Sequence, residues 1–292
     1  MFDSMEYLCH YTKQEHAKNI IKNMVLRFGK ICESNDPTEV VGVRTNLTLT
    51  TTNPLSLQID DESESVIAAI ENYMKIYLNK ILQVICFSKG SIKNIEGDVE
   101  ANIKDDFIDT LEMDSIGVFS KRPPYYLPRM WAQYGENHSG VCLVFNKKRL
   151  INQVIEQTRN AYNFIHRDVM YDDWLDLLLL RGFALSYEYH EYNTMHIMQF
   201  IHENLEQYSN YCCFTKDIDW KNEREYRFLL LNTIENNNYK NKEININNET
   251  LIGVIFGLRN NGHQLKNILY ESNIKNILKL KYEDNMIKLK QL

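Results

Sequence analysis

Apolar residues in this chain gather in short runs, and turn residues follow the ends of these runs. Such runs are typical of buried strands, because a strand that is covered on both faces needs apolar side chains at successive positions. The pattern predicts strands at 7–12, 83–88, 140–145, 222–231 and 251–258.

Other segments repeat their apolar residues every three or four positions, which predicts helices. This spacing indicates helices over about 13–24 and 129–136, the second opened by Pro128. The range 147–211 is mainly helical in pattern, and no Pro/Gly/Ser-rich linker flanks it, so we expect an insert within the same domain. The sequence therefore predicts a single α+β domain over 1–292, with a mixed, largely antiparallel sheet around a cleft.

Composition places the chain among globular proteins. Of its 292 residues, 44% are apolar and 25% are charged, which allows a large core and argues against disorder. The longest aliphatic run, 174–180, is interrupted by Asp176 and is far shorter than the roughly 20 residues of a membrane span. The N-terminus is acidic where a signal peptide needs basic residues and an apolar stretch. We therefore expect a cytoplasmic protein with no membrane partner.

Charge, cysteine content and the absence of known motifs argue against several kinds of partner and site. A formal net charge of −6 argues against a broad nucleic-acid-binding surface, because such surfaces need clustered Lys and Arg. The six cysteines show no Cys-x-x-Cys spacing, so we expect reduced, buried thiols rather than a zinc or redox site. The sequence contains no P-loop, Gly-rich dinucleotide fingerprint, His-Glu-x-x-His motif or serine elbow, and no metal site is predicted.

The segment 220–228 (WKNEREYRF) carries candidate chemistry. On a strand, Glu223, Glu225 and Arg227 would share one face. Two carboxylates this close repel each other unless a cation or a shift in protonation compensates. One interpretation is an ion-paired edge strand, in which Arg227 and Arg224 neutralise the acids. The other is a pair of acids that holds a sugar hydroxyl and stabilises an oxocarbenium-like centre.

Two further groups supply candidate binding residues. Trp131, Tyr134 and His138 fall on one helix face. Trp131 is expected in the core, whereas the polar ends of Tyr134 and His138 suit a pocket. His10 and Thr12 end the first strand two residues apart, so their imidazole and hydroxyl point the same way. A lone histidine at a strand end is more often a core or capping residue than a catalyst, and the alternative partners for this pair are ribose hydroxyls.

Six segments, taken in order, resemble a known family. The chain is similar along nearly its whole length to the bacterial family catalogued as domain of unknown function 2971. No reaction is attached to that family, so the resemblance indicates kinship rather than activity. The segments are HYTKQEHAKNIIKNMVLRF, SNDPTEV, ICFSKG, MWAQYGENHSGVCLVF, WKNEREYRF and GVIFGL.

A more distant resemblance is to the ADP-ribosyltransferase superfamily, whose first strand ends in His-x-Thr and whose late strand carries a glutamate. It implies an ADP-ribosyltransferase-like fold in which His10 and Thr12 hold the NAD ribose. Tyr134 would stack on nicotinamide and Glu225 would orient a ribose hydroxyl. Glu223 would be the first acid of a Glu-x-Glu pair, the pattern of arginine-modifying members.

Ser88, at the end of the second predicted strand, competes with Tyr134 for the middle position of this motif. The resemblance thus implies a catalytic set and a larger binding set. The catalytic residues would be Glu225, Glu223 and His10. The residues that bind NAD would be His10, Thr12, Ser88, Tyr134, His138 and Arg227.

These residues support two hypotheses of different classes. The first is an NAD-dependent, ADP-ribosyltransferase-like enzyme that cleaves the nicotinamide glycosidic bond and modifies a protein or nucleic acid, in a toxin or phage-defence setting. The second is a non-catalytic module that binds a nucleotide or a partner protein in the same cleft. A nuclease is less favoured, because the chain is acidic and lacks a recognisable metal-binding triad.

Overall fold

The structure is a computed structural model of the whole chain. It describes residues 5–33, 46–50, 79–92, 124–172, 184–188, 213–232, 240–262, 265–274, 276–283 and 286–292, together with residues 68, 72, 76 and 199.

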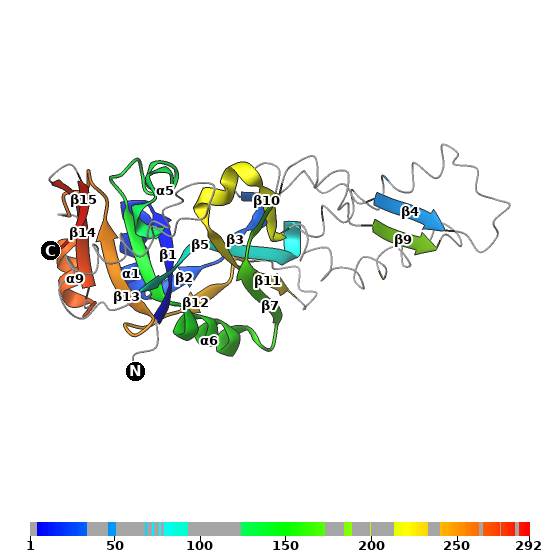
Figure 1. Ribbon diagram of the computed structural model, residues 1–292. Helices are drawn as coiled ribbons and strands as arrows, with labels where there is room; N and C mark the ends of the chain where they lie inside the picture. Colours follow the sequence, from blue (N-terminus) through cyan, green and yellow to red (C-terminus); the bar gives the residue numbers. More distant parts are fainter. Residues whose placement is uncertain are drawn as a thin grey trace.

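The described residues form one large sheet of nine strands, in the order β15-β14-β13-β6-β1-β5-β11-β7, with the short strand β3 also paired to β5 (Figure 1). Every pair is antiparallel except β13–β14, which is parallel. This confirms the prediction of a mixed, largely antiparallel sheet. The strands are β1 (Met5–Thr12), β3 (Gly29–Lys30), β5 (Leu82–Ile92), β6 (Val141–Asn146), β7 (Tyr162–Asp168), β11 (Glu225–Asn232), β13 (Leu251–Phe256), β14 (Asn276–Glu283) and β15 (Met286–Gln291).

Three smaller strand pairs accompany the large sheet. The antiparallel pair joins β2 (Val25–Arg27) to β12 (Glu243–Asn245). The two parallel pairs join β8 (Met170–Asp172) to β10 (Thr215–Asp217), and β4 (Asn46–Thr50) to β9 (Ala184–Glu188).

Helices are present in both ranges that the sequence predicted, about 13–24 and 129–136, although the second helix ends at Gln133. Pro128 stands at the first turn of α5, where its missing N–H costs no hydrogen bond. The α-helices whose bounds fall in the described part of the chain are α1 (Gln14–Asn23), α5 (Pro128–Gln133), α6 (Lys147–Thr158) and α9 (Lys266–Glu271). The 3-10 helices are η1 (Ile31–Glu33), η2 (Pro124–Tyr126) and η3 (Ile218–Glu223).

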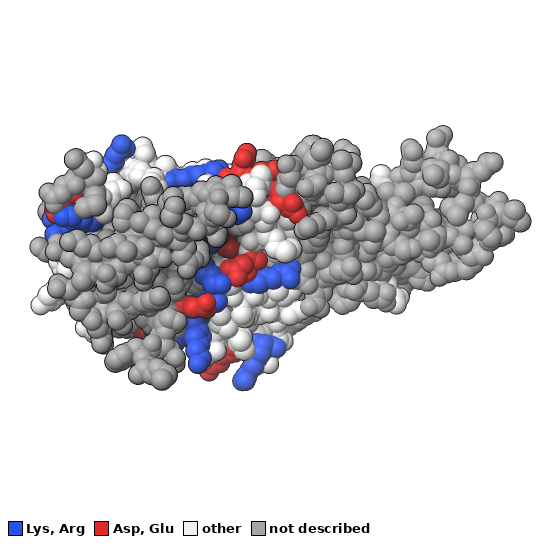
Figure 2. Space-filling view, viewed as in Figure 1, with Lys and Arg blue, Asp and Glu red and all other residues white. Residues whose placement is uncertain are grey.

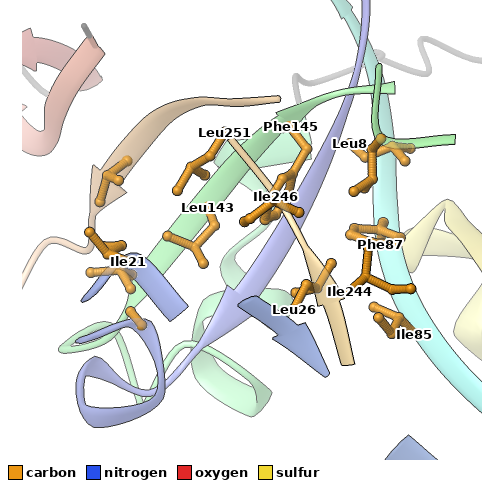
Figure 3. Packing of buried hydrophobic residues seen from close by; sticks show 14 of the residues in the cluster. Leu8, Ile21, Leu26, Ile85, Phe87, Leu143, Phe145, Ile244, Ile246 and Leu251 are labelled. Carbon is orange, nitrogen blue, oxygen red and sulfur yellow. The ribbon is translucent and has the colours of Figure 1, made fainter. Parts of the chain in front are cut away.

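Successive side chains of a strand point to opposite faces of the sheet, and both faces are covered here. We call the first the Phe87 face. It carries the larger core, in which α1, α6, α9 and the β2–β12 pair pack on the sheet (Figure 3). Its sheet residues include Leu8, Ile85, Phe87, Leu143, Phe145, Tyr226 and Phe228.

We call the opposite side the Trp131 face, and α5 and η2 pack on it. The indole of Trp131 is 1% exposed, donates from Nε1 to the Tyr125 carbonyl at 2.9 Å and meets the ring of Tyr11 edge-on. This confirms the prediction that Trp131 belongs to the core. The sheet residues of this face include Tyr7, Cys9, Tyr11, Cys142 and Val144.

Over its described residues, the helical prediction for 147–211 holds only in part. α6 and Gln199 are helical, whereas β7, β8 and β9 are strands. β7 hydrogen-bonds to β11 along its whole length, so pairing with a strand 60 residues away decides its conformation against a local helical pattern. Residues 173–183, 189–198 and 200–212 lie outside the described part. Over the described residues, no helix has both the length and the apolar character that crossing a membrane requires.

Candidate functional site

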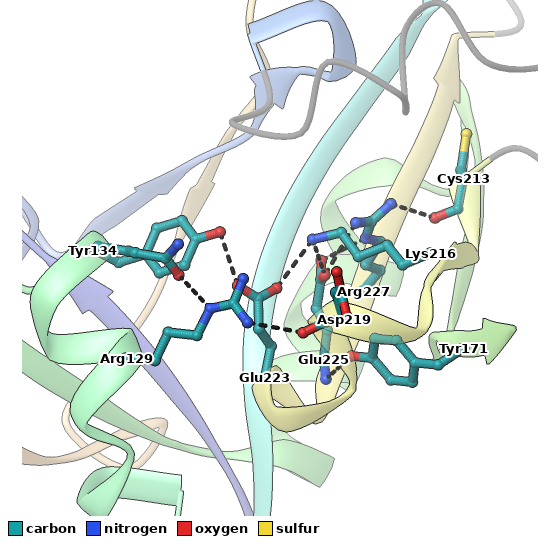
Figure 4. A network of polar contacts seen from close by, with 10 residues as sticks. Arg129, Tyr134, Tyr171, Cys213, Lys216, Asp219, Glu223, Glu225 and Arg227 are labelled. Atoms are coloured by element: carbon teal, nitrogen blue, oxygen red, sulfur yellow. Dashed lines mark hydrogen bonds and ion pairs between the residues drawn. The ribbon is translucent and has the colours of Figure 1, made fainter. Parts of the chain in front are cut away.

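Four charged side chains are buried together on the Trp131 face, where β10, η3 and the first residues of β11 meet (Figure 4). Lys216, Glu223, Glu225 and Arg227 are each no more than 5% exposed. Buried charges of this kind are stable only when they are paired and hydrogen-bonded, and all four are.

Lys216 bridges the two carboxylates. Its Nζ lies 3.0 Å from Oε2 of Glu223 and 2.8 Å from Oε2 of Glu225. Arg227 binds Glu225 through two nitrogens, Nε to Oε1 at 2.5 Å and Nη2 to Oε2 at 3.0 Å. The guanidinium is held in turn by the carbonyl of Cys213, which accepts from Nη1 at 2.6 Å. The two acids therefore share one cation, and Glu225 has a second cation of its own.

The two glutamates do not share a strand, which corrects the face assignment made from the sequence. β11 begins at Glu225, Glu223 ends η3, and Arg224 between them takes a left-handed conformation with φ of 48°. The turn at Arg224 nevertheless brings both carboxylates to Lys216. β11 lies between β5 and β7, so the interpretation as an edge strand is wrong, although the ion pair of Arg227 with Glu225 is present.

Tyr134 connects α5 to this cluster. Its hydroxyl donates to Oε1 of Glu223 at 3.1 Å. Arg129, one helical turn earlier, donates to the carbonyl of Asp219 at 2.8 Å and lies over the ring of Trp220 at 4.6 Å. The same ring lies 5.0 Å from Nζ of Lys216, so Trp220 covers the bridging ammonium from the side of η3.

The two carboxyl groups are shifted in opposite directions. Burial raises the pKa of the Glu223 carboxyl, and Lys216 opposes this only in part. Burial also favours a higher pKa for the Glu225 carboxyl. The nearby charges of Arg227 and then Lys216 outweigh burial and lower this pKa to about 2. Burial and the nearby Glu223 raise the pKa of the Tyr134 hydroxyl. One acid is thus held ionised while its neighbour binds a proton more readily, an arrangement that suits acid–base work.

β5 supplies the neighbours of Glu225 across the sheet. Ser88 stands directly opposite Glu225, and Cys86 stands opposite Arg227. Ser88 is fully buried, and its Oγ has no hydrogen-bond partner among the described residues. Cys86 is exposed, and its thiol hydrogen-bonds to the Glu225 carboxylate. Cys86 is thus exposed, whereas Arg227 and Lys216, the other side chains that contact the carboxylate, are buried.

His10 and Thr12 are not brought to this cluster. His10 lies edge-on against Phe87, its Nδ1 is 3.1 Å from the carbonyl of Cys86, and burial lowers the pKa of its imidazole. Its neighbour Cys9 stands opposite Ser88 on the Trp131 face, so His10 and Thr12 point to the Phe87 face. Thr12 is buried there.

His138 lies at another place on the Trp131 face. Its ring is stacked 6.5 Å from that of Trp131, and its carbonyl accepts from the backbone of Arg259 at 2.9 Å. The structure thus brings together Tyr134, Glu223, Glu225 and Arg227, with Ser88 adjacent. It places His10, Thr12 and His138 elsewhere.

Sequence reasoning missed Lys216, Cys86 and Tyr171, whose hydroxyl accepts from the Glu225 backbone N–H at 2.8 Å. The repulsion between two acids did signal that a cation was needed. It did not identify Lys216, because that residue lies seven positions before Glu223, outside the predicted strand 222–231, on the short strand β10 that pairs with β8. Among the described residues, no group of three or more His, Cys, Asp or Glu side chains is arranged to hold a metal ion.

The described residues form a mixed α+β protein with a buried, ion-paired cluster of two glutamates, a lysine and an arginine. Residues 130–228 match the model of a family described as protein of unknown function (DUF2971). The match covers about a third of the chain and includes Tyr134, Lys216 and both glutamates. It supports the resemblance to that family. No curated protein and no solved structure matches the chain, and no comparison supports the resemblance to ADP-ribosyltransferases.

Proposed function

We propose that the chain is a cytoplasmic enzyme that cleaves the nicotinamide glycosidic bond of NAD and transfers ADP-ribose to a macromolecule, in a toxin or phage-defence setting. The observation that carries the proposal is the pair of acids around Lys216, one held ionised and the other with a raised pKa. The proposal assigns no role in this chemistry to His10 or Thr12.

Glu225 would act on the breaking bond. As the bond from ribose C1′ to nicotinamide breaks, nicotinamide leaves with the electron pair and positive charge develops on the ribose. A fixed carboxylate beside the ribose stabilises that charge more than it stabilises the ground state. A pKa of about 2 keeps Glu225 ionised throughout the physiological range.

Glu223 would act on the acceptor. An acceptor nucleophile that forms the new bond to C1′ must lose a proton, and a carboxylate whose pKa is raised by burial accepts one more readily than an ordinary carboxylate. The Tyr134 hydroxyl orients this group, because it donates to Oε1 while Lys216 binds Oε2.

Access to Glu225 limits how the substrate binds. A carboxylate offers about four acceptor sites, and the two nitrogens of Arg227, Lys216 and the Cys86 thiol account for that number. The thiol is the weakest of these donors and the one on the exposed side. We therefore propose that a ribose hydroxyl replaces the Cys86 thiol at Glu225.

Because the acceptor sites of Glu225 are all occupied, a second candidate is also favoured. It is a non-catalytic module that binds a nucleotide or a protein over this cluster. In that case Lys216 and Arg227 hold the acids as a rigid support, and no bond is broken. The two candidates differ in whether NAD is consumed.

The experiment measures nicotinamide release from NAD by wild-type protein, with and without a cell extract as a source of acceptor. Glu225→Gln should reduce turnover by about 10² or more at nearly unchanged NAD affinity, since it deletes the charge and keeps the shape. Glu223→Gln should impair transfer to the acceptor and spare slow hydrolysis of NAD.

A melting curve of each variant is the control, because loss of an ion pair also acts on folding. Full activity of Glu225→Gln at unchanged stability would refute the catalytic role. If wild-type protein consumes no NAD with any extract, the binding module takes its place.

A further inference from the structure

A second charged cluster lies on the Phe87 face, around Tyr226. Nζ of Lys147 lies 4.4 Å from the centroid of the Tyr226 ring, and Nζ of Lys89 lies 5.5 Å from it. The ring is buried at 4% exposure, and its hydroxyl lies 2.7 Å from Nδ1 of His166. Two ammonium groups thus share one aromatic support, on the side of the sheet away from Glu225.

Each lysine pairs with a carboxylate that is more exposed than itself. Lys147 binds Glu6 at 2.7 Å, and the two side chains are 13% and 51% exposed. Lys89 binds Asp168 at 3.0 Å, with exposures of 31% and 60%. The lysines are anchored against Tyr226, whereas the carboxylates have solvent on most sides and hold their positions weakly. Another anion can therefore replace these carboxylates at little cost in free energy.

Glu6 lies in the field of both lysines. The hydrogen bond from Lys147 lowers the pKa of the Glu6 carboxyl, and the charge of Lys89 contributes to the same shift. Lys147 is also the first residue of α6, whose first turn holds no acidic residue. Cations at a helix N-terminus oppose the helix dipole, so an anion at this place, from Glu6 or from a ligand that replaces it, relieves an unfavourable arrangement.

We propose that Lys89 and Lys147 bind a phosphate group of a small molecule, and that Glu6 occupies its position when the ligand is absent. A phosphate presents several anionic oxygens to the two ammonium groups, and the side chain of Glu6 presents only one carboxylate. On the face seen in Figure 2, the described Lys/Arg and Asp/Glu side chains are interspersed and build no broad patch of one sign. Glu6 and Asp168 stand beside the two lysines, so a compact phosphorylated ligand suits this site better than a nucleic acid, which needs a broad positive surface. The proposal stands apart from NAD cleavage at Glu225.

The test is titration calorimetry of the full chain with inorganic pyrophosphate and, separately, with ADP. We expect binding that weakens as salt is added. Lys147→Met and Lys89→Met should each weaken it about tenfold, the loss of one charge-assisted contact. Glu6→Gln should strengthen it about threefold or more, because it removes the competing anion. The matched control is Lys290→Met, whose lysine pairs with Glu283 at 3.4 Å with similar exposure and should leave affinity unchanged.

The gain expected from Glu6→Gln keeps the test informative, since a misfolded variant cannot bind more tightly. Tighter binding of ADP than of pyrophosphate identifies a nucleotide as the ligand, and equal binding identifies the phosphate group alone. The proposal is overturned if neither probe binds wild-type protein or Glu6→Gln at millimolar concentration. It is also overturned if Lys290→Met weakens binding as much as Lys147→Met.

Discussion

His10 and Glu225 belong to the same sheet and point to opposite faces of it. Cys9 stands opposite Ser88, and Ser88 stands opposite Glu225, so these three side chains share the Trp131 face. His10, next to Cys9, is packed against Phe87 on the other face. His10 and Glu225 therefore lie in different environments, although their strands belong to one sheet.

A first prediction concerns the acid stability of His10. Because burial lowers its pKa in the folded state, the unfolded chain takes up the proton first, and stability is lost as pH falls below the unfolded value of about 6.5. The slope for one proton is at most about 1.4 kcal/mol per pH unit. His10→Gln should make urea unfolding less sensitive to pH between 6.5 and 5, and NAD turnover should be unchanged.

The pH range of this effect distinguishes the contribution of His10 from that of Glu225. The lowered pKa of Glu225 gives stability that is present above its unfolded value of about 4.3 and is lost only as pH falls toward 2. A His10→Gln variant with the same pH dependence as wild type above pH 5 would contradict the role given to burial. Loss of NAD turnover in His10→Gln at unchanged stability would show that His10 takes part in catalysis.

A second prediction concerns Lys216, which holds two buried carboxylates. Lys216→Met keeps most of the length of the side chain but leaves Glu223 without its cation, so the free energy of unfolding should fall by about 3 to 5 kcal/mol. Denaturant unfolding at pH 7 measures this loss of stability. The exposed pair of Lys290 and Glu283 is the control, and Lys290→Met should cost less than about 1 kcal/mol. Equal losses in the two variants would show that the buried bridge contributes little.

A third prediction concerns access to the centre through Cys86. Of the thiols described, Cys86 is exposed, whereas Cys9, Cys142 and Cys213 are buried. If a ribose hydroxyl replaces the Cys86 thiol at Glu225, NAD should slow the alkylation of Cys86 by iodoacetamide several-fold, as followed by peptide mass spectrometry. Alkylated protein should no longer consume NAD, and Cys86→Ala, which removes the donor, should remain active and insensitive to the reagent. Alkylation at the same rate with saturating NAD would place the substrate elsewhere.

A fourth prediction contrasts two tryptophans. Trp131 is 1% exposed within the core of its face, so Trp131→Ala should cost about 3 to 5 kcal/mol of stability. Trp220 is half-buried over Lys216 and Arg129, and Trp220→Ala should cost about 1 to 2 kcal/mol. Thermal unfolding compares them. A Trp131→Ala variant with wild-type stability and lost ligand binding would show that Trp131 is a binding residue.

The sequence by itself determined the elements whose pattern is local. The apolar runs that become β5, β6 and β13 and the period that becomes α1 carry their own signal, because burial on one or both faces requires those residues at those positions. It also indicated that Glu223 and Glu225 need a cation, since their repulsion follows from spacing alone.

Only the tertiary structure decided which cation, which face and which neighbours. Lys216 reaches the two acids from another strand, the left-handed turn at Arg224 sets their geometry, and β7 is a strand because β11 lies beside it. The face of His10 relative to Glu225 depends on the register of β1, β5 and β11, and a shift of one residue would reverse it. Register arises from contacts between residues far apart in the chain, which no local pattern contains.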